Sequence, residues 1–293
     1  MNNNLRLRPI HRFVSQFAIC SALLLGLGLF SGCKREMPAG RDYAAANHER
    51  GTQIVAEYLK RDAAPYRKQR IRLTITSTSE PLKVYELEIW RKQTEGETLT
   101  LTHVVQPAEE SDLAALSVER KGEPTINVTY VSSADQFRET GTNKMFFGGL
   151  TAQELLGEWD KYDYSLVAEK DRDGVKAYEV EGTLKPAAES VIARTRTLFR
   201  GDTYLPVEMH LFNSAGEEVR TFQVKAYRNV AGREAVWVTE VENHVRPTKV
   251  TIETLGLEFP EKADDAMFTR DRLKQLSRGS SPTVREGAGK RPR

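Results

Sequence analysis

An alternation of apolar and polar residues with a period of two runs through most of this chain and limits what it can fold into. Ile71, Leu73 and Ile75 alternate with polar residues, and the same pattern recurs over residues 85–89 and 99–103. Successive side chains of a β-strand point to opposite faces of a sheet, so the pattern predicts strands with one apolar and one polar face. The chain is therefore expected to be mainly β.

About ten or eleven segments have this pattern, and turn residues such as Gly174 separate several of them. Two helices are expected, an amphipathic one over residues 44–61 and a short one from residue 151 to about residue 162. Strands and helices do not alternate, which argues against an α/β fold. We expect a single curved antiparallel sheet that forms a half-open barrel, with the two helices and the Phe146-Phe147 loop plugging its concave side.

The N-terminal segment has the layout of a bacterial lipoprotein signal. Three arginines within residues 6–12 precede an apolar run over residues 13–30, and the small residues Ser31 and Gly32 precede Cys33. This order is typical of a signal that is cleaved before the cysteine. We expect a covalent lipid, such as palmitate, on Cys33. The alternatives are an ordinary signal peptide and a retained membrane span. For a membrane span, the apolar run is barely long enough to cross a bilayer.

These features divide the chain into four parts. Residues 1–32 are predicted to be the signal peptide, 33–43 a tether, 44–276 one half-barrel domain, and 277–293 a disordered basic tail. The whole chain has a net charge of +2. Its signal and tail supply an excess of arginines, so the domain between them is mildly acidic, and nucleic acid is not an expected partner.

No motif for catalysis or for metal binding stands out. The sequence contains neither Gly-x-Ser-x-Gly nor His-Glu-x-x-His, and its histidines are scattered. Cys20 lies in the predicted signal and Cys33 would carry a lipid, so no thiol pair remains for a disulfide or a cysteine-metal site. We therefore expect no enzyme, no metal, and no cofactor beyond the covalent lipid.

From residue 145 onward, short motifs follow one another in a distinctive order. They are Phe147-Gly148-Gly149 before residues 151–156, Tyr162-Asp163-Tyr164, Asp173-Gly174 with Ala177-Tyr178, Asp202 with Tyr204-Leu205-Pro206-Val207, Gly216, Tyr227, Gly232 with Trp237, Glu242-Asn243-His244, Lys249-Val250-Thr251, Asp264-Asp265 and Phe268-Thr269. In order and spacing they resemble the outer-membrane lipoprotein-sorting family, the LolA/LolB-like proteins. The resemblance implies a half-open barrel that holds acyl chains and has no catalytic residues.

We therefore expect a lipid-anchored protein that binds the acyl chains of lipoproteins or lipids and transfers them at the outer membrane. Exposing one methylene to water costs about 0.8 kcal/mol, so an acyl chain needs an apolar site to cross an aqueous gap. If the apolar face points inward, its candidate lining residues are Leu73, Ile75, Leu87, Ile89, Leu101, Val128, Tyr130, Met209 and Leu211. Phe146, Phe147 and Trp159 are the candidate cover.

The predicted partners are acyl chains, a bacterial membrane, and either a periplasmic carrier or an inner-membrane transporter. Lys34 stands where resemblance to enterobacterial lipoproteins would place an aspartate for inner-membrane retention, which favours the periplasmic face of the outer membrane. Two alternatives remain. One is a sensor of lipid-linked signals, although relatives of that kind append a domain where only a tail is expected here. The other is a structural envelope protein without cargo.

Overall fold

The computed structural model describes residues 41–278 apart from Lys121, Glu158, Asp173, Ala263 and residues 142–148, 152–153 and 155–156. Its strands are β1 (Tyr66–Ser77), β2 (Lys83–Gln93), β3 (Glu97–Gln106), β4 (Ala114–Arg120), β5 (Ile126–Val131), β6 (Gln136–Thr140), β7 (Tyr162–Arg172), β8 (Val175–Leu184), β9 (Arg194–Arg200), β10 (Pro206–Phe212), β11 (Glu218–Val230), β12 (Arg233–Asn243) and β13 (Thr248–Glu258). All described residues belong to one compact unit.

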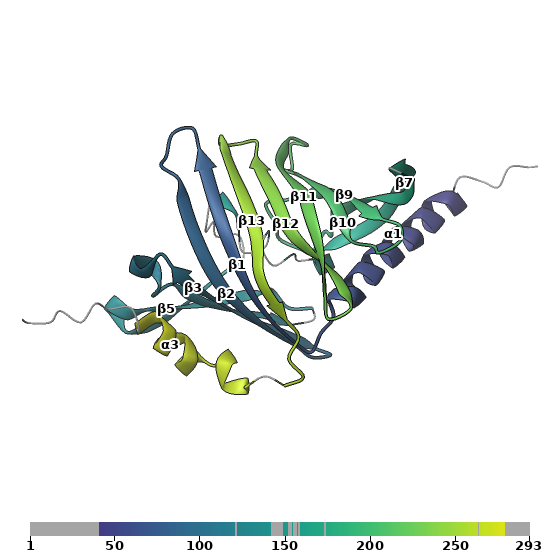
Figure 1. Ribbon diagram of the computed structural model, residues 1–293. Helices are drawn as coiled ribbons and strands as arrows, with labels where there is room; N and C mark the ends of the chain where they lie inside the picture. Colours follow the sequence, from purple (N-terminus) through teal and green to yellow (C-terminus); the bar gives the residue numbers. More distant parts are fainter. Residues whose placement is uncertain are drawn as a thin grey trace, which may run out of the picture. The chain divides into compact units, whose positions relative to one another are not determined.

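The thirteen strands form a single antiparallel sheet in the order β6-β5-β4-β3-β2-β1-β13-β12-β11-β10-β9-β8-β7 (Figure 1). Among the described residues, the end strands β6 and β7 do not pair with each other, so the sheet stays open. The mainly β fold and the half-open sheet are thereby confirmed.

Two of the strands have no counterpart among the predicted segments. They are β4 and β6, and each has a weak pattern. β4 begins with two alanines, and β6 has five residues of which only Phe137 is apolar. Both strands form because they complete the hydrogen-bonding ladder on β3 and β5, a tertiary constraint that overrides a weak local signal.

The helices match the prediction in part. α1 (Arg41–Asp62) corresponds to the helix expected over residues 44–61 and begins inside the predicted tether. α3 (Arg270–Arg278) was not predicted, and it includes the first two residues of the predicted tail. Of the short helix expected from residue 151 to about residue 162, residues 152–153, 155–156 and 158 lie outside the described residues. Its described end forms the 3-10 turn η4 (Trp159–Lys161), and β7 begins at residue 162. No helix among the described residues is long and apolar enough to cross a membrane.

The register of the strands defines two faces of the sheet. Leu73 pairs with Tyr85 on β2 and with Ile252 on β13, so the three side chains share one face, which we call the inner face. Arg72, its neighbour in sequence, points to the opposite, outer face. Figure 1 shows that the sheet bends strongly along its strand order.

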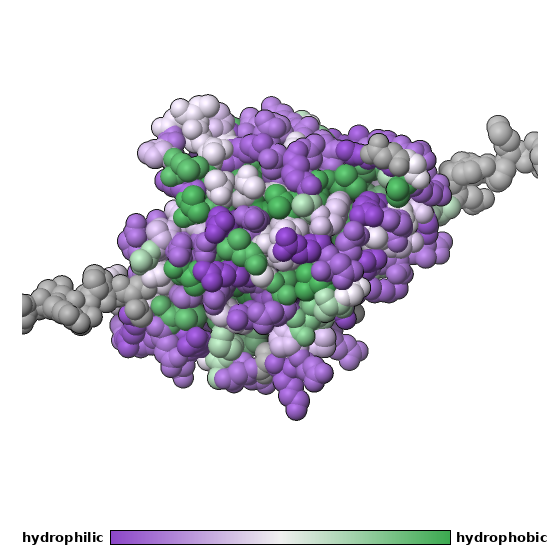
Figure 2. Space-filling model, viewed as in Figure 1, coloured by the Kyte–Doolittle hydropathy of each residue, from purple (hydrophilic) through white to green (hydrophobic). Residues whose placement is uncertain are grey.

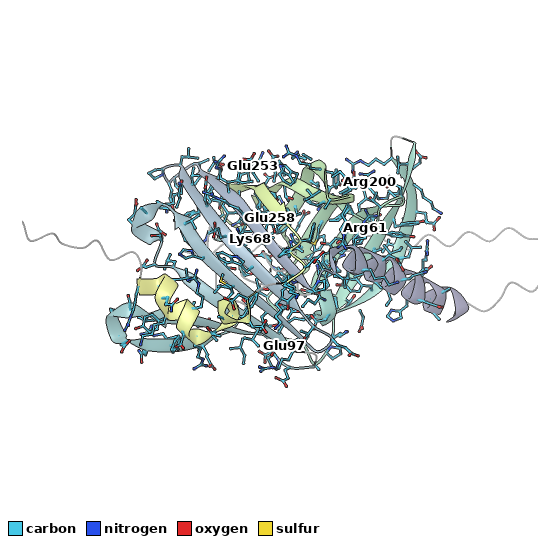
Figure 3. The ribbon with its side chains drawn as sticks, turned by 60° about the horizontal axis from the view of Figure 1, so that its bottom comes forward. Arg61, Lys68, Glu97, Arg200, Glu253 and Glu258 are labelled. Atoms are coloured by element: carbon cyan, nitrogen blue, oxygen red, sulfur yellow. The ribbon has the colours of Figure 1, made fainter. Side chains whose placement is uncertain are left out.

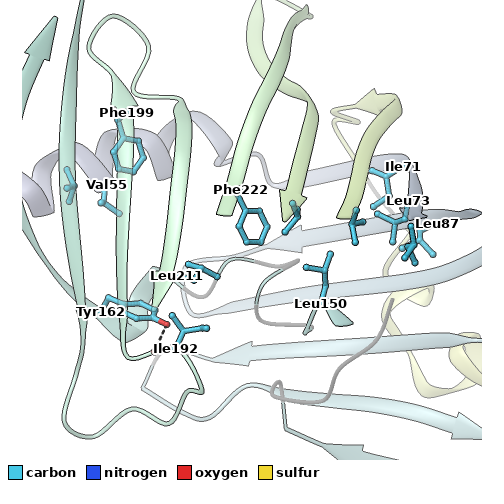
Figure 4. Close-up of a cluster of buried hydrophobic side chains, with 14 of the residues drawn as sticks. Val55, Ile71, Leu73, Leu87, Leu150, Tyr162, Ile192, Phe199, Leu211 and Phe222 are labelled. Atoms are coloured by element: carbon cyan, nitrogen blue, oxygen red, sulfur yellow. Dashed lines mark hydrogen bonds between the residues drawn. The ribbon is translucent and has the colours of Figure 1, made fainter. Parts of the chain in front are cut away.

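The inner face carries the larger core cluster, which extends in the sheet order from β3 to β7 and is covered at one end by α1. Tyr58 of α1 packs against Trp159 and Phe199, with ring centroids 5.0 Å and 5.9 Å apart. Figure 4 shows Phe199, Leu211 and other members of this cluster projecting from the strands toward one another. The position of α1 on this face agrees with the predicted plug.

The outer face is polar over β1, β2 and β13. Glu86 forms ion pairs with Arg70 at 2.6 Å and with Arg72 at 2.8 Å. Lys68 and Glu258, which pair across β1 and β13, are labelled in Figure 3. At the other end of the sheet, α3 and the 3-10 turn η5 (Asp265–Phe268) cover the outer face of β3–β6 with a second apolar cluster.

Candidate functional site

A cavity of about 1050 Å³ lies on the inner face. The described residues that line it come from β1 to β5, from β11 to β13, from the turns beside these strands, and from the segment before β7. In the sheet order, five strands separate β5 from β12, which would place them roughly 29 Å apart in a flat sheet. Because both strands line one cavity, the sheet must curl around it. Sites for small molecules usually measure about 300–1,000 Å³, so this cavity is large enough for a sizeable ligand.

One wall of the cavity is apolar and is built by β1, β2, β12 and β13 with one residue of β11. Its side chains are Ile71, Ile75, Tyr85, Leu87, Ile89, Phe222, Trp237 and Ile252. These residues lie on the inner face because the alternation of each strand is in phase with that of its neighbours. These eight side chains offer hydrocarbon and aromatic surface, and the charged lining residues of the same strands are Arg67 and Lys83.

The opposite wall is polar and is built by β3, β4 and β5. It presents Thr102, Ala115, Ser117, Asn127 and Thr129 to the cavity. Most apolar residues of these strands belong to the outer cluster with α3, so the polar half of each alternation faces inward. Val104, near the end of β3, is an exception that lies on the inner face beside Leu87. The cavity therefore has two chemically different sides.

One end of the cavity opens between the β1–β2 and β12–β13 turns, where Ser79, Glu80 and Arg246 line it. Leu82 and Val245 project from the same turns and are 63% and 68% exposed. We call this end the mouth. Large exposed apolar residues beside an opening are typical of surfaces that contact a membrane or a protein, and Figure 2 shows several apolar patches among the hydrophilic residues of the face in view.

A buried ion pair lies beside the cavity. Arg220 of β11 places Nε 3.4 Å from Oε1 of Glu154, and its two terminal nitrogens donate hydrogen bonds to Asn243 Oδ1 at 2.6 Å and to the Gly149 carbonyl at 2.8 Å. Glu154 also accepts a hydrogen bond from the backbone N–H of Thr151. Burial lowers the pKa of the Arg220 guanidinium, while the charge of Glu154 opposes that shift. The pair holds the segment before β7 against the inner face.

A protein-family model described as "-like: Uncharacterized protein" matches residues 96–275, more than half of the chain. The chain belongs to this family, and its fold is LolA-like. That fold is shown by a LolA superfamily protein from Nitrosomonas europaea, which has a TM-score of 0.65 and 12% identity, with 76% of this chain and 98% of that chain covered. The predicted resemblance is thus confirmed.

Two further solved structures agree with this LolA-like fold. A DUF1329 family protein from Desulfovibrio piger has a TM-score of 0.71 at 18% identity, covering 79% of this chain and 99% of its own. A putative outer membrane lipoprotein-sorting protein domain from Vibrio parahaemolyticus has a TM-score of 0.71 at 16% identity, covering 78% and 100%. No curated protein sequence matches the chain.

The LolA-like fold brings some of the predicted site residues together and separates others. Ile75, Leu87, Ile89 and Tyr130 are among the residues that line the cavity. Leu73 and Leu211 are buried in the inner core cluster, and Met209 and Trp159 are partly buried against it. Phe146 and Phe147 lie outside the described residues.

Leu101 and Val128 require a correction. The prediction assumed that the apolar residues of every strand point inward, but Leu101 pairs with Trp90 and Leu116 on the outer face. Val128 pairs with Leu116 in the same cluster, beneath Leu273 of α3. Both side chains are buried in the cluster that includes Leu273 of α3 and are not among the cavity-lining residues.

Several cavity residues were missed by the sequence prediction. Tyr85 belonged to a recognised alternation and could have been included on its phase alone. Trp237 lies on a strand that was expected around residue 238, but the face of that strand was not assigned. The polar wall had no signal of its own, because a threonine or asparagine in an alternating strand normally indicates a solvated face. Among the described residues, no group of His, Cys, Asp and Glu side chains is arranged to hold a metal ion.

Proposed function

We propose that this chain is a lipid-anchored envelope protein that binds the acyl chains of lipoproteins or of other lipids and passes them on at the outer membrane, facing the periplasm. Its role is binding and transfer, without catalysis. The observation that carries the proposal is the open cavity on the inner face, with its apolar wall.

The apolar wall fits hydrocarbon chains. Leu87 and Ile89 of β2, Ile252 of β13 and Trp237 of β12 line it with carbon surface. The charged lining residues of β1 and β2 are Arg67 and Lys83, which lie near the ends of their strands. Each methylene that leaves water gains about 0.8 kcal/mol, so even a partly inserted acyl chain would be held against its aqueous surroundings. A site of this kind removes the free-energy cost that prevents a lipid from crossing water unaided.

The exposed apolar residues at the mouth support exchange with a second hydrophobic surface. Leu82 and Val245 border the opening, and Leu113 after the 3-10 turn η1 (Ala108–Glu110) is also exposed. An acyl chain that leaves the cavity between these residues could enter a bilayer or another carrier without full exposure to water. The predicted lipid on Cys33 would keep the molecule at a membrane, which suits an acceptor better than a diffusing carrier.

A structural protein without cargo would be expected to fill its interior with its own side chains, as close-packed cores do. The cavity of about 1050 Å³ makes this alternative less suitable. A sensor of lipid-linked signals would use the same cavity, so the two remaining functions share the binding step that the following experiment measures.

The test uses a fluorescent fatty-acid probe and two matched tryptophan variants of β12. Thr239 lines the cavity beside Ile252, whereas its neighbour Val238 pairs with Glu253 on the outer face. In Thr239→Trp the indole would occupy the cavity and weaken probe binding by about tenfold or more, while Val238→Trp should bind like the unmodified protein. Thermal unfolding of both variants checks that each is folded. Equal probe binding by the two variants, or none by the unmodified protein, would rule the proposal out.

A further inference from the structure

The polar wall is ordered in two cross-strand rows. Thr102 of β3 pairs with Ala115 of β4, which pairs with Thr129 of β5. In the adjacent row Thr100 pairs with Ser117, which pairs with Asn127. Residues that pair directly across strands have their side chains side by side. These two rows thus place hydroxyl and amide groups side by side on the inner face of β3–β5.

The first row has the shape of a niche. Thr102 and Thr129 stand on strands that are two places apart, which separates them by roughly 10 Å. Ala115 lies between them and carries only a methyl group, so the space above it is bounded by the two hydroxyls. Thr102 also pairs with Ile89 on its other side, where the apolar wall begins. In this row, the boundary between apolar and polar lining therefore falls between β2 and β3.

The hydrogen-bonding capacity of this wall is not used up by the protein. Within the described structure, the hydroxyls of Thr102 and Thr129 form no hydrogen bond. The Thr100 hydroxyl also has no partner, but this residue is 1% exposed and is not among the lining residues. Ser117 donates to Asn127 Oδ1, and Asn127 Nδ2 reaches the Gly141 carbonyl only at 3.4 Å. Thr102 and Thr129 are half-buried and line the cavity, so their hydroxyls are available for hydrogen bonds with polar groups of a ligand.

The charges of the lining are placed away from this wall or are already paired. Glu80 and Lys83 form an ion pair at 2.9 Å, and Glu154 is paired with Arg220. The remaining charged lining residues are Arg67, which donates to Gln69 at 2.7 Å, and Glu110, Asp112 and Arg246 in the turns at the mouth. The described residues of β3–β5 that line the cavity carry no charge, so the niche offers no cation to a phosphate or carboxylate.

We propose that the cavity selects amphiphiles whose acyl chain ends in an uncharged, hydroxyl-bearing head, with the head in the niche between Thr102 and Thr129. This inference rests on the proposed lipid-binding function and narrows its ligand class. The acyl chain lies along β2, β1 and β13, and the hydroxyls of the head exchange hydrogen bonds with the wall. A carboxylate head at the same place would lose its water without gaining a cation, which weakens its binding.

The test compares two ligands that share a lauroyl chain, monolauroylglycerol and laurate, as competitors of the fluorescent probe on the full-length protein. Monolauroylglycerol is expected to bind about tenfold more tightly, since two neutral hydrogen bonds together correspond to roughly that ratio. In the double variant Thr102→Val/Thr129→Val, which removes the hydroxyls at nearly constant shape, this preference should disappear while the affinity for laurate stays the same.

The control is Thr74→Val/Thr251→Val, a pair that faces each other across β1 and β13 on the outer face and should keep the full preference. Ala115→Leu, which fills the niche, should also lower the affinity for monolauroylglycerol more than that for laurate. Equal affinities of the unmodified protein for the two ligands, or an equal loss of both in the niche variants, would overturn this inference alone. Failure of the unmodified protein to bind the probe would overturn the proposed function as well.

Discussion

Arg220 and Glu154 form an ion pair at 3.4 Å with side chains that are only 9% and 4% exposed. The same guanidinium also bonds to Asn243 on β12 and to the Gly149 carbonyl. Three separate parts of the chain, β11, β12 and the segment before β7, therefore meet at one buried positive charge. Removing one partner of such a pair leaves the other charge buried without compensation.

We predict that Arg220→Met lowers the free energy of unfolding by about 3 kcal/mol, measured by urea denaturation. Arg246→Met, which changes an exposed arginine in the β12–β13 turn, should have an effect within about 0.5 kcal/mol. Adding Glu154→Gln to Arg220→Met should restore part of the loss, because the buried carboxylate is then neutral. If Arg220→Met is as stable as the unmodified protein, the Arg220–Glu154 pair does not hold the segment before β7.

Gly51 allows α1 to approach β7 closely. A Cβ atom at this position would lie 2.6 Å from the Ser165 carbonyl carbon and 2.7 Å from the Leu166 nitrogen, both backbone atoms that cannot rotate away. We expect Gly51→Ala to destabilise the fold by about 1–3 kcal/mol, because the helix must move off the sheet. Gly96→Ala, whose added Cβ would meet nothing within 4 Å, is the control and should leave the thermal midpoint nearly unchanged.

Asp135 attaches α3 to the β5–β6 turn. Its carboxylate forms ion pairs with Lys274 at 2.8 Å and with Arg278 at 2.6 Å. The hydrogen bond from Lys274, followed by that from Tyr130, lowers the pKa of Asp135 to about 2. Because this folded-state pKa lies below the unfolded value of about 3.9, the carboxylate stabilises the fold above about pH 4, and this contribution is lost as the pH falls toward about 2.

The variant Asp135→Asn tests this pH dependence, and asparagine also tolerates the left-handed backbone found here, with φ of 47°. The urea midpoint of the variant should lie below that of the unmodified protein at neutral pH, and the difference should shrink between about pH 4 and about pH 2. Asp163→Asn, an exposed position on β7, is the control. A difference that persists unchanged at the lowest pH would contradict the role of the carboxylate.

The predicted lipid on Cys33 has a direct test in cells. Replacing Cys33 by Ala should abolish labelling with a radioactive or clickable fatty acid and move the protein from the membrane fraction to the soluble fraction, because the covalent chains are then absent. Retention of the variant in the membrane fraction would refute the lipid anchor.

The strands of this fold could be predicted because alternation is a local property of the sequence. It correctly indicated β1, β2 and β3 and most of the later strands. Alternation does not reveal which face of a strand will be covered, however, and this is why Leu101 and Val128 were assigned to the wrong side. Their orientation depends on pairing with β2 and on the packing of α3, which are contacts between distant segments.

α3 itself could not be recognised from its sequence. Among its nine residues only Leu273 and Leu276 are large and apolar, and most of the others are charged. Its position depends on Phe268, on the apolar cluster of β3–β5 and on the attachment to Asp135. The polar wall of the cavity was missed for the same reason, since it faces inward only because this helix covers the apolar side of those strands.

The most direct measurement of the central claim is mass spectrometry of the lipids extracted from gently purified full-length protein. Cys33→Ala in every sample removes the protein's own anchor, and Thr239→Trp is compared with Val238→Trp. The account predicts acyl lipids in the Val238→Trp sample at a level similar to that of the parent protein, and their strong depletion from the Thr239→Trp sample. Absence of lipid from the parent protein, or equal amounts in the two tryptophan variants, would contradict it.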